Sequence, residues 1–329
     1  MKLNPTKKLK AQIDVEAKIG AKFKFFKSKV NSENVEEKIY ESEWTHNLVT
    51  DWGLSQLSSS TSNLLNNIVV GSSSTAPDVS QTTLSNKIAH TGAAAPTQPN
   101  NEIQVATAPF YIAIRKTFRF AAGTATGIIA EVGLSPTGTN VFNRALVKDS
   151  NGNPSTITVL SDEILDILCE VRVYLADTIS GSFPLKDKVG NTLRTVNYTG
   201  KPYLPSAASS YSFHLTKIGL VKAGNGVIVY SGSLNSGYVT APSGTSAVSN
   251  TPDVTETPTY PTSTQFAYLL KFGASVANFT HKSLTTRISG LATNSSVLGY
   301  QVEFDEGIAK TGSETLQYSF SLSWGRYVA

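Results

Sequence analysis

The chain has 329 residues, of which 40% are hydrophobic and 16% are charged, and its formal net charge is +4 at pH 7. This length corresponds to about two domains of roughly 150 residues, and the near-neutral charge with this apolar content excludes disorder over the whole chain. The sequence contains no apolar run of the roughly 18 residues that a membrane-spanning helix needs, and its first residues lack the apolar core of a secretory signal. We therefore expect neither membrane insertion nor export.

Residues 1–45 are predicted to form a basic N-terminal arm and a β-hairpin. Residues 1–29 contain nine lysines and two acidic residues, whereas residues 31–43 contain five glutamates and one lysine. Apolar and polar side chains alternate from Gln12 to Phe25, as in a half-buried strand. A turn at residues 32–35 would fold this basic strand onto the acidic one, with opposite charges facing each other across the ladder.

Two interpretations remain open for these lysines. They neutralise the acidic strand within the hairpin, or a free arm at residues 2–10 docks on an acidic neighbouring protein. The candidate docking residues are five lysines along this segment, namely Lys7, Lys8, Lys10, Lys22 and Lys24. Nucleic acid is not an expected partner, because the segment contains no arginine and no recognised binding motif.

Residues 46–177 are predicted to form a β-sandwich domain. A short helix is expected near residues 47–58, with Thr45 or Asn47 as its N-cap. The strand candidates that follow are NIVV, APFYIAIRKTFRFAAG, GIIAEVGLSP, NVFNRALV, STITVL and EILDILCEVRVYL. Short strands at such regular spacing favour a mainly β, antiparallel sandwich or jelly-roll-like fold over alternating βαβ units.

Residues 178–329 are predicted to form a second β-rich domain. The strand candidates are YSFHLTKIGLV, GVIVYSG, FAYLLKFG, TTRISGL, GYQVEF and LQYSFSLSWGRYV. Residues 238–265 are rich in Pro, Thr and Ser and are expected to form a long surface loop, at a subunit contact or exposed. The last strand is expected to complete a sheet, and the first sheet of the chain is a candidate.

No residue constellation typical of an enzyme was found. Cys169 lies in a period-two apolar pattern, as expected of a core residue rather than a nucleophile. The four histidines are scattered, and no phosphate loop or nucleophile elbow is present. Asp149, Asn151 and Asn153 begin a calcium-loop pattern, but Pro154 and Leu160 occupy the positions that need Gly and Glu. We therefore expect a non-enzymatic protein with no catalytic residues, metal or cofactor.

A cluster of acidic residues surrounds Cys169 in the sequence. SDEILDILCE contains four carboxylates that superficially resemble a glycosidase site, namely Asp162, Glu163, Asp166 and Glu170. The alternation places Asp166 and Glu170 on the strand face opposite Cys169, together with Arg172. This arrangement predicts a solvated strand face with an ion pair rather than an acid/base pair.

About two fifths of the chain resembles a group of tail or tail-associated structural proteins of tailed bacteriophages. The resemblance covers roughly residues 40–175 and the terminal SFSLSWGR. Two sequence elements carry the resemblance. The first is N-x-x-T-D-x-G-L, with Asn47, Asp51, Gly53 and Leu54, and it is followed by a loop that contains Gly71 and Pro77. The second is E-V-G-L…F-x-R-A, with Glu131, Val132, Gly133, Leu134, Phe142, Arg144 and Ala145. These positions maintain the fold in that family. Independently, Gly53 and Gly133 suit turns or close backbone approach, Leu54 and Leu134 suit the core, and Arg144 suits an ion pair with Glu131.

The resemblance implies a virion protein that is made in the host cytoplasm. The expected function is a tail, baseplate or collar subunit whose partners are other copies of itself and neighbouring virion proteins; low charge and Ser/Thr/Gly-rich strands suit a packed symmetric array. A capsid decoration or head-fibre protein is an alternative. A third hypothesis is a host-glycan-binding module in which tyrosines stack on sugars, with the candidates Tyr198, Tyr203, Tyr211 and Tyr260.

Overall fold

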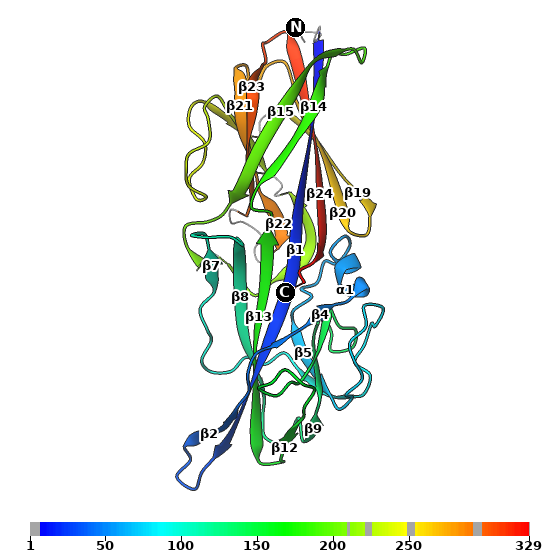
Figure 1. The fold of residues 1–329 in the computed structure, drawn as a ribbon, viewed down its shortest axis with the longest axis vertical. Coiled ribbons are helices and arrows are strands. Elements are labelled where there is room, and N and C mark those ends of the chain that lie inside the picture. Colours follow the sequence, from blue (N-terminus) through cyan, green and yellow to red (C-terminus); the bar gives the residue numbers. More distant parts are fainter. Residues whose placement is uncertain (1–6, 209–210, 221–225, 249–253, 292–297, 329) are drawn as a thin grey trace.

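The computed structural model describes residues 7–208, 211–220, 226–248, 254–291 and 298–328. Its fold is mainly β and is built almost entirely from antiparallel sheets, as the alternating sequence pattern predicted. Figure 1 shows an elongated molecule in which the first strand runs along much of the long axis. The described N-terminal end lies at one tip, and the C-terminal end lies near the middle.

The largest sheet has 15 strands. Ten of them form a continuous path, in the order β18 (Ser246–Val248), β17 (Val227–Tyr230), β21 (Thr280–Thr286), β23 (Gly299–Ala309), β15 (Thr192–Tyr203), β14 (Ile179–Lys186), β1 (Lys7–Val30), β13 (Glu163–Leu175), β8 (Tyr111–Phe120) and β7 (Glu102–Gln104). The others branch from this path: β2 (Glu36–Glu41), β3 (Thr45–His46) and β24 (Glu314–Arg326) pair with β1, β20 (Gln265–Phe272) pairs with β24, and β19 (Val254–Thr262) pairs with β20.

Three smaller sheets complete the strand inventory of the described residues. The five-stranded sheet has the order β4 (Leu48–Val49), β11 (Asn143–Leu146), β10 (Glu131–Ser135), β5 (Asn67–Gly71) and β6 (Lys87–Thr91). The two-stranded sheets are β9 (Gly127–Ile129) with β12 (Ile157–Val159), and β16 (Leu215–Leu220) with β22 (Ile288–Leu291).

Strand β1 connects the two β-rich halves of the chain. Its segment Ala17–Lys29 pairs antiparallel with β13, and its segment Lys7–Ile19 pairs in parallel with β24. The last strand therefore lies beside the first. Because β1 pairs with strands from before and after residue 177, the three sequence regions 1–45, 46–177 and 178–329 all contribute strands to the large sheet.

The core is a continuous apolar layer on the inner face of β1. In the half that contains β13, Phe23 and Phe25 are buried together with residues of the five-stranded sheet such as Val132. In the other half, the rings of Phe304 and Tyr318 stack with centroids 6.2 Å apart, which packs β23 against β24. The five-stranded sheet therefore covers the large sheet in one half, and branches of the large sheet face each other in the other half. The polar side chains of β1 point to the opposite face.

The predicted hairpin between the basic and acidic strands is present. β1 pairs antiparallel with β2 through a turn at residues 31–35, and Lys29 lies opposite Glu37. Asn34 has a φ of 60° in this turn, a conformation that asparagine tolerates better than most residues. Figure 1 shows that the β1–β2 hairpin projects beyond the rest of the molecule.

The short helix α1 spans Asp51–Gln56, inside the predicted range, but its N-cap is Thr50. The prediction of Thr45 or Asn47 as the cap was wrong because the residues around them are used by β3 and β4. Thr50 Oγ1 accepts a hydrogen bond from the Gly53 amide at 2.9 Å. Gly53 itself packs against the backbone of Phe142 so closely that a Cβ atom has no room, which confirms the predicted close approach.

The prediction of a long loop at residues 238–265 was wrong. The described part of this range contains β18 and β19, and β19 pairs antiparallel with β20. The prolines favoured the loop prediction because proline cannot donate a ladder hydrogen bond. Pro258 and Pro261 are nevertheless compatible with β19 because it is an edge strand whose outer side needs no donor.

Candidate functional site

The first three candidate docking lysines lie in β1. Lys7, Lys8 and Lys10 are opposite Glu314, Thr315 and Gln317 of β24 in the parallel ladder. The hypothesis of a free arm at residues 2–10 is therefore wrong from residue 7 onward, because the backbone there is paired with β24. Residues 1–6 lie outside the described residues.

The other two candidates, Lys22 and Lys24, lie further along the same strand and have partners within the chain. Lys24 Nζ is 2.5 Å from a carboxylate oxygen of Glu41 on β2. Lys22 Nζ is 3.1 Å from Glu170 on β13 and lies 4.3 Å from the ring centroid of Trp44. The strand rise of about 3.3 Å per residue puts roughly 40 Å between Lys10 and Lys22. The five lysines therefore form two separate groups rather than one surface.

The most deeply buried charge pair is Glu131 with Arg144. They come from neighbouring strands, β10 and β11, and Arg144 Nε is 2.7 Å from Glu131 Oε2. The two side chains are 0% and 1% exposed respectively. The ion pair confirms the one predicted from the sequence.

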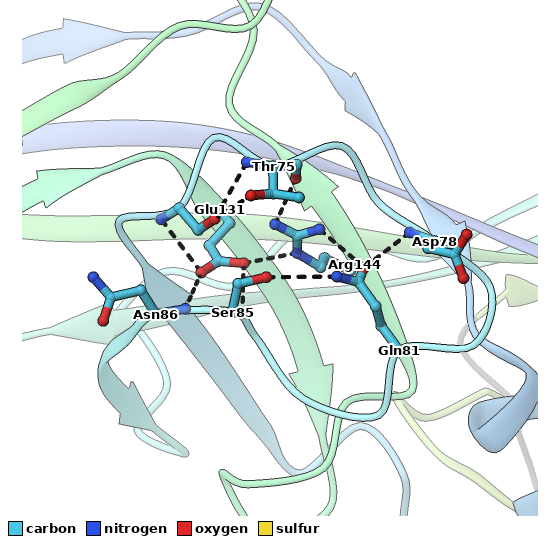
Figure 2. Close-up of polar contacts among 8 residues, drawn as sticks. Thr75, Asp78, Gln81, Ser85, Asn86, Glu131 and Arg144 are labelled. Carbon is cyan, nitrogen blue, oxygen red and sulfur yellow. Dashed lines mark hydrogen bonds and ion pairs between the residues drawn. The ribbon is translucent and has the colours of Figure 1, made fainter.

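Figure 2 shows how a loop closes over this pair. The amides of Asn86 and Ser85 donate to the two oxygens of Glu131, at 2.8 and 3.2 Å. Arg144 donates to Gln81 Oε1 at 2.9 Å and to the carbonyl of Thr75 at 2.7 Å. The pair therefore holds the segment between β5 and β6 against the small sheet. Sequence reasoning missed these loop partners, because backbone amides and a lone glutamine carry no recognisable pattern.

Glu170 is the centre of a second buried cluster. Its side chain is 0% exposed and contacts three cations, Lys22 at 3.1 Å, Arg115 at 2.6 Å and Arg172 at 2.6 Å. The register explains this arrangement, since His46, Lys22, Glu170 and Arg115 lie in one row across β3, β1, β13 and β8. Arg115 also pairs with Glu102 on β7.

The charges around Glu170 decide its ionisation. Burial opposes the charged form, but the hydrogen bond from Arg115 and the charges of Arg172 and Lys22 outweigh it, and the pKa of Glu170 is lowered. The expectation of a solvated strand face was wrong for this residue. Its three cations come from β1, β8 and β13, so a pattern within one strand did not reveal the burial.

The neighbouring carboxylates are each paired with a cation. Asp162 pairs with Lys29 at 2.5 Å, Glu163 with Lys27 at 2.8 Å, and Asp166 with Arg119 at 2.6 Å. Each carboxylate thus has its own cationic partner, which differs from the paired acid and base of a glycosidase.

Cys169 and His281 are two further buried groups with side chains of a potentially reactive type. Burial raises the pKa of the Cys169 thiol well above its ordinary value, although Lys116 opposes this, and the thiol is fully buried. Burial lowers the pKa of His281 to about 4. His281 Nε2 lies 2.9 Å from the carbonyl of Ala277 and therefore donates to it, so that Nδ1 accepts from the Tyr318 hydroxyl at 2.8 Å. Both residues have a packed, structural environment.

The tyrosines considered for sugar stacking are mostly inside the protein. Tyr198, Tyr203 and Tyr211 are 5%, 5% and 6% exposed, and Tyr260 donates its hydroxyl proton to the carbonyl of Ile218. A ring that stacks on a sugar needs an open face. The stacking hypothesis is therefore wrong for Tyr198, Tyr203 and Tyr211.

Within the described residues, no cluster of three or more His, Cys, Asp or Glu side chains could hold a metal ion. Across the same part of the chain, no helix is both long enough and apolar enough to cross a membrane. Comparisons of the chain with family models, with curated proteins and with solved structures find no match.

Proposed function

We propose that this chain is a non-enzymatic structural subunit of a tailed bacteriophage virion, of the tail, baseplate or collar type. The proposal rests on the sequence resemblance over residues 40–175 and on one structural observation. That observation is strand β1, which spans 24 residues and belongs to the ladders of both β-rich halves.

This strand suits a subunit that transmits load between neighbours. Separation of the two halves along the strand direction would shear the β1–β13 ladder over Ala17–Lys29 and the β1–β24 ladder over Lys7–Ile19. In a sheared ladder many hydrogen bonds must break together. Trp324 Nε1 also donates to the carbonyl of Leu54 at 2.9 Å, which ties the end of β24 to α1.

The two ends of β1 differ in charge and offer contacts for neighbouring copies. At the N-terminal end the strand begins with Lys7, Lys8 and Lys10, and the last of these lies opposite Lys186 of β14. At the other end the projecting hairpin carries Glu33 and Glu37 and exposes three aliphatic side chains, Val30, Val35 and Ile39, which are 47–52% exposed. Basic and acidic ends support head-to-tail docking between copies, with the aliphatic residues adding contact area.

Immunogold labelling tests the proposed place in the virion. An antibody raised against the recombinant chain would be applied to purified particles whose genome encodes it. Label at the tail, baseplate or collar is the expected result. Label on the capsid surface would favour the decoration or head-fibre alternative, and particles without label would contradict a virion role.

A further inference from the structure

A pocket of about 200 Å³ lies on the outer face of the large sheet, on the side of β1 that faces away from the core. Its walls come from β1, β13, the β3–β4 segment and the residues at the end of β24. Gly20 lies on the polar side of β1 between Lys18 and Lys22, and Tyr327 packs over it, 3.4 Å from the position that a Cβ atom would take. The absence of a side chain at Gly20 therefore lets Tyr327 lie close to β1, where it forms part of the pocket wall.

The pocket is positively charged. Among its described lining residues are three cations, Lys22, Arg172 and Arg326, whose side chains are 18–25% exposed. The acid that lines it, Glu170, is already contacted by Lys22, Arg172 and the more distant Arg115. Arg326 is paired with Asp51, whereas Lys22 and Arg172 share Glu170, so cations still outnumber acids in the pocket wall, and each cation retains access to solvent.

The titration of His46, at the edge of the pocket, agrees with this surplus. Burial lowers the pKa of His46, and the charges of Lys22 and Arg172 lower it further, against a smaller opposing effect of Glu170. The neighbouring cations therefore disfavour another positive charge beside them.

Asn47 provides an unused hydrogen-bond donor in the pocket wall. Its Oδ1 accepts from the Ala21 amide at 2.8 Å, which fixes the orientation of the side-chain amide. Its Nδ2 is buried and has no hydrogen-bond partner among the described residues. Buried donors nearly always have an acceptor, so a bound acceptor would satisfy this group.

The size and the aromatic wall of the pocket limit its ligand. The rings of Tyr174 and Tyr327 stack with centroids 3.6 Å apart at an angle of 11°, which gives the pocket a rigid side. Its volume is smaller than the roughly 300–1,000 Å³ of sites for drug-sized ligands. The ligand is therefore about the size of a single sugar ring.

We propose that this pocket binds a small ligand through a carboxylate, the chemistry that acidic sugars and simple organic acids share. The carboxylate lies against Lys22 and Arg172, and Asn47 Nδ2 donates to a ligand oxygen. Guanidinium and ammonium groups form their strongest hydrogen bonds with such an anion. This site is independent of the proposed virion role, since its geometry is complete within one chain.

Calorimetry with paired probes tests the site on the full chain. D-glucuronate and D-glucose differ at one carboxylate, and succinate provides a carboxylate without a sugar ring. Glucuronate is expected to bind when it is titrated up to about 10 mM, and to bind more weakly at high salt. Glucose is not expected to bind over the same range. Weaker binding of succinate than of glucuronate would identify acidic sugars as the source, and equal binding would identify organic acids.

Three single variants connect the binding to the pocket. Lys22→Gln removes a pocket cation, and Gly20→Val crowds the pocket wall at Tyr327 without changing a charge. Lys24→Gln is the matched control, because Lys24 lies two residues away on the same face and pairs with Glu41 outside the pocket. The first two are expected to weaken glucuronate binding by about tenfold or more, and the control is expected to leave it unchanged.

Three results would overturn the proposal. They are equal binding of glucose and glucuronate, no binding of either carboxylate probe, or an equal loss of binding in the Lys22→Gln and Lys24→Gln variants. Thermal unfolding of each variant establishes that it is folded, and Gly20→Val remains informative if Lys22→Gln is destabilised.

Discussion

Two buried glutamates, Glu131 and Glu170, show how the same residue type is used in two different ways. Each side chain is 0% exposed and each contacts an arginine on its own or a neighbouring strand. Around Glu131, one cation and several backbone amides form a closed set that holds a loop. Around Glu170, three partly exposed cations surround one acid beside an open pocket.

The two sites differ in whether the cations around the glutamate keep unused charge and access to solvent. The guanidinium of Arg144 uses its other donors on Gln81 and Thr75 and has 1% exposure. The cations around Glu170 keep both surplus charge and access to solvent. Burial of a carboxylate therefore marks a structural site when the charges balance, and it marks a candidate binding site when they do not.

The largest effect is expected for Arg144→Met, which leaves Glu131 as an uncompensated buried charge. The free energy of unfolding should fall by about 3–5 kcal/mol, measured by urea denaturation. The double variant with Glu131→Gln should lose less, because it removes the orphaned charge. The control is Arg194→Met, whose partner Glu306 is 71% exposed, with an expected loss below about 1 kcal/mol. Similar losses for Arg144→Met and Arg194→Met would contradict the distinction between a buried and an exposed ion pair.

The buried histidine His281 allows the effect of a buried titratable group on stability to be measured through pH. His281 has a pKa of about 4 in the folded state, against 6.5 ordinarily. Because the unfolded chain takes up the proton first, stability should fall as the pH drops from 6.5 towards 4, by roughly 3 kcal/mol in total. Unfolding titrations at several pH values measure this slope. The slope should flatten in His281→Gln but not in the exposed-site control His90→Gln, and an unchanged slope in His281→Gln would contradict the assignment.

An intermediate effect is expected for Glu170→Gln. The change leaves three cations close together, and the free energy of unfolding at neutral pH should fall by about 2 kcal/mol. Because the folded-state pKa of Glu170 is lowered, its contribution is present above the unfolded pKa and disappears as the pH falls through the folded value. The wild type and the variant should therefore converge in strong acid. A constant difference at every pH would assign the effect to packing alone.

The smallest effects are expected for Lys22→Gln and Lys24→Gln. Each lysine is partly exposed, and each loss should stay below about 1 kcal/mol in the same urea measurement. If the Lys22→Gln and Lys24→Gln variants are nearly equal in stability but differ in glucuronate binding, Lys22 contributes to ligand binding rather than to the stability of the fold. A loss above about 2 kcal/mol for Lys22→Gln alone would make the Glu170 cluster structural as well.

Local patterns predicted those features that depend on one strand or one turn. The alternation in β1, the turn of the β1–β2 hairpin, a helix inside residues 47–58 and the Glu131–Arg144 pair all agree with the structure. Each of these depends on period-two burial or on short sequence separation.

Features that depend on distant strands were not predictable in this way. The pairing of β8 with β13 brings Arg115 to Glu170. The return of the last strand to the first sheet was predicted as a candidate, but the parallel register with β1 that places Arg326 and Tyr327 at the pocket was not. Nothing in any one segment specifies these neighbours. The strand β19 was missed for a related reason, since its prolines are tolerated only because it lies at a sheet edge.

The proposed virion role is tested most directly by a cryo-electron microscopy map of the particle whose genome encodes this chain. The expected result is repeated density for the elongated subunit in the tail, baseplate or collar, with the β1–β2 hairpin of one copy against the N-terminal end of β1 in the next. A complete map of the particle that contains no density for this fold would contradict the proposed function.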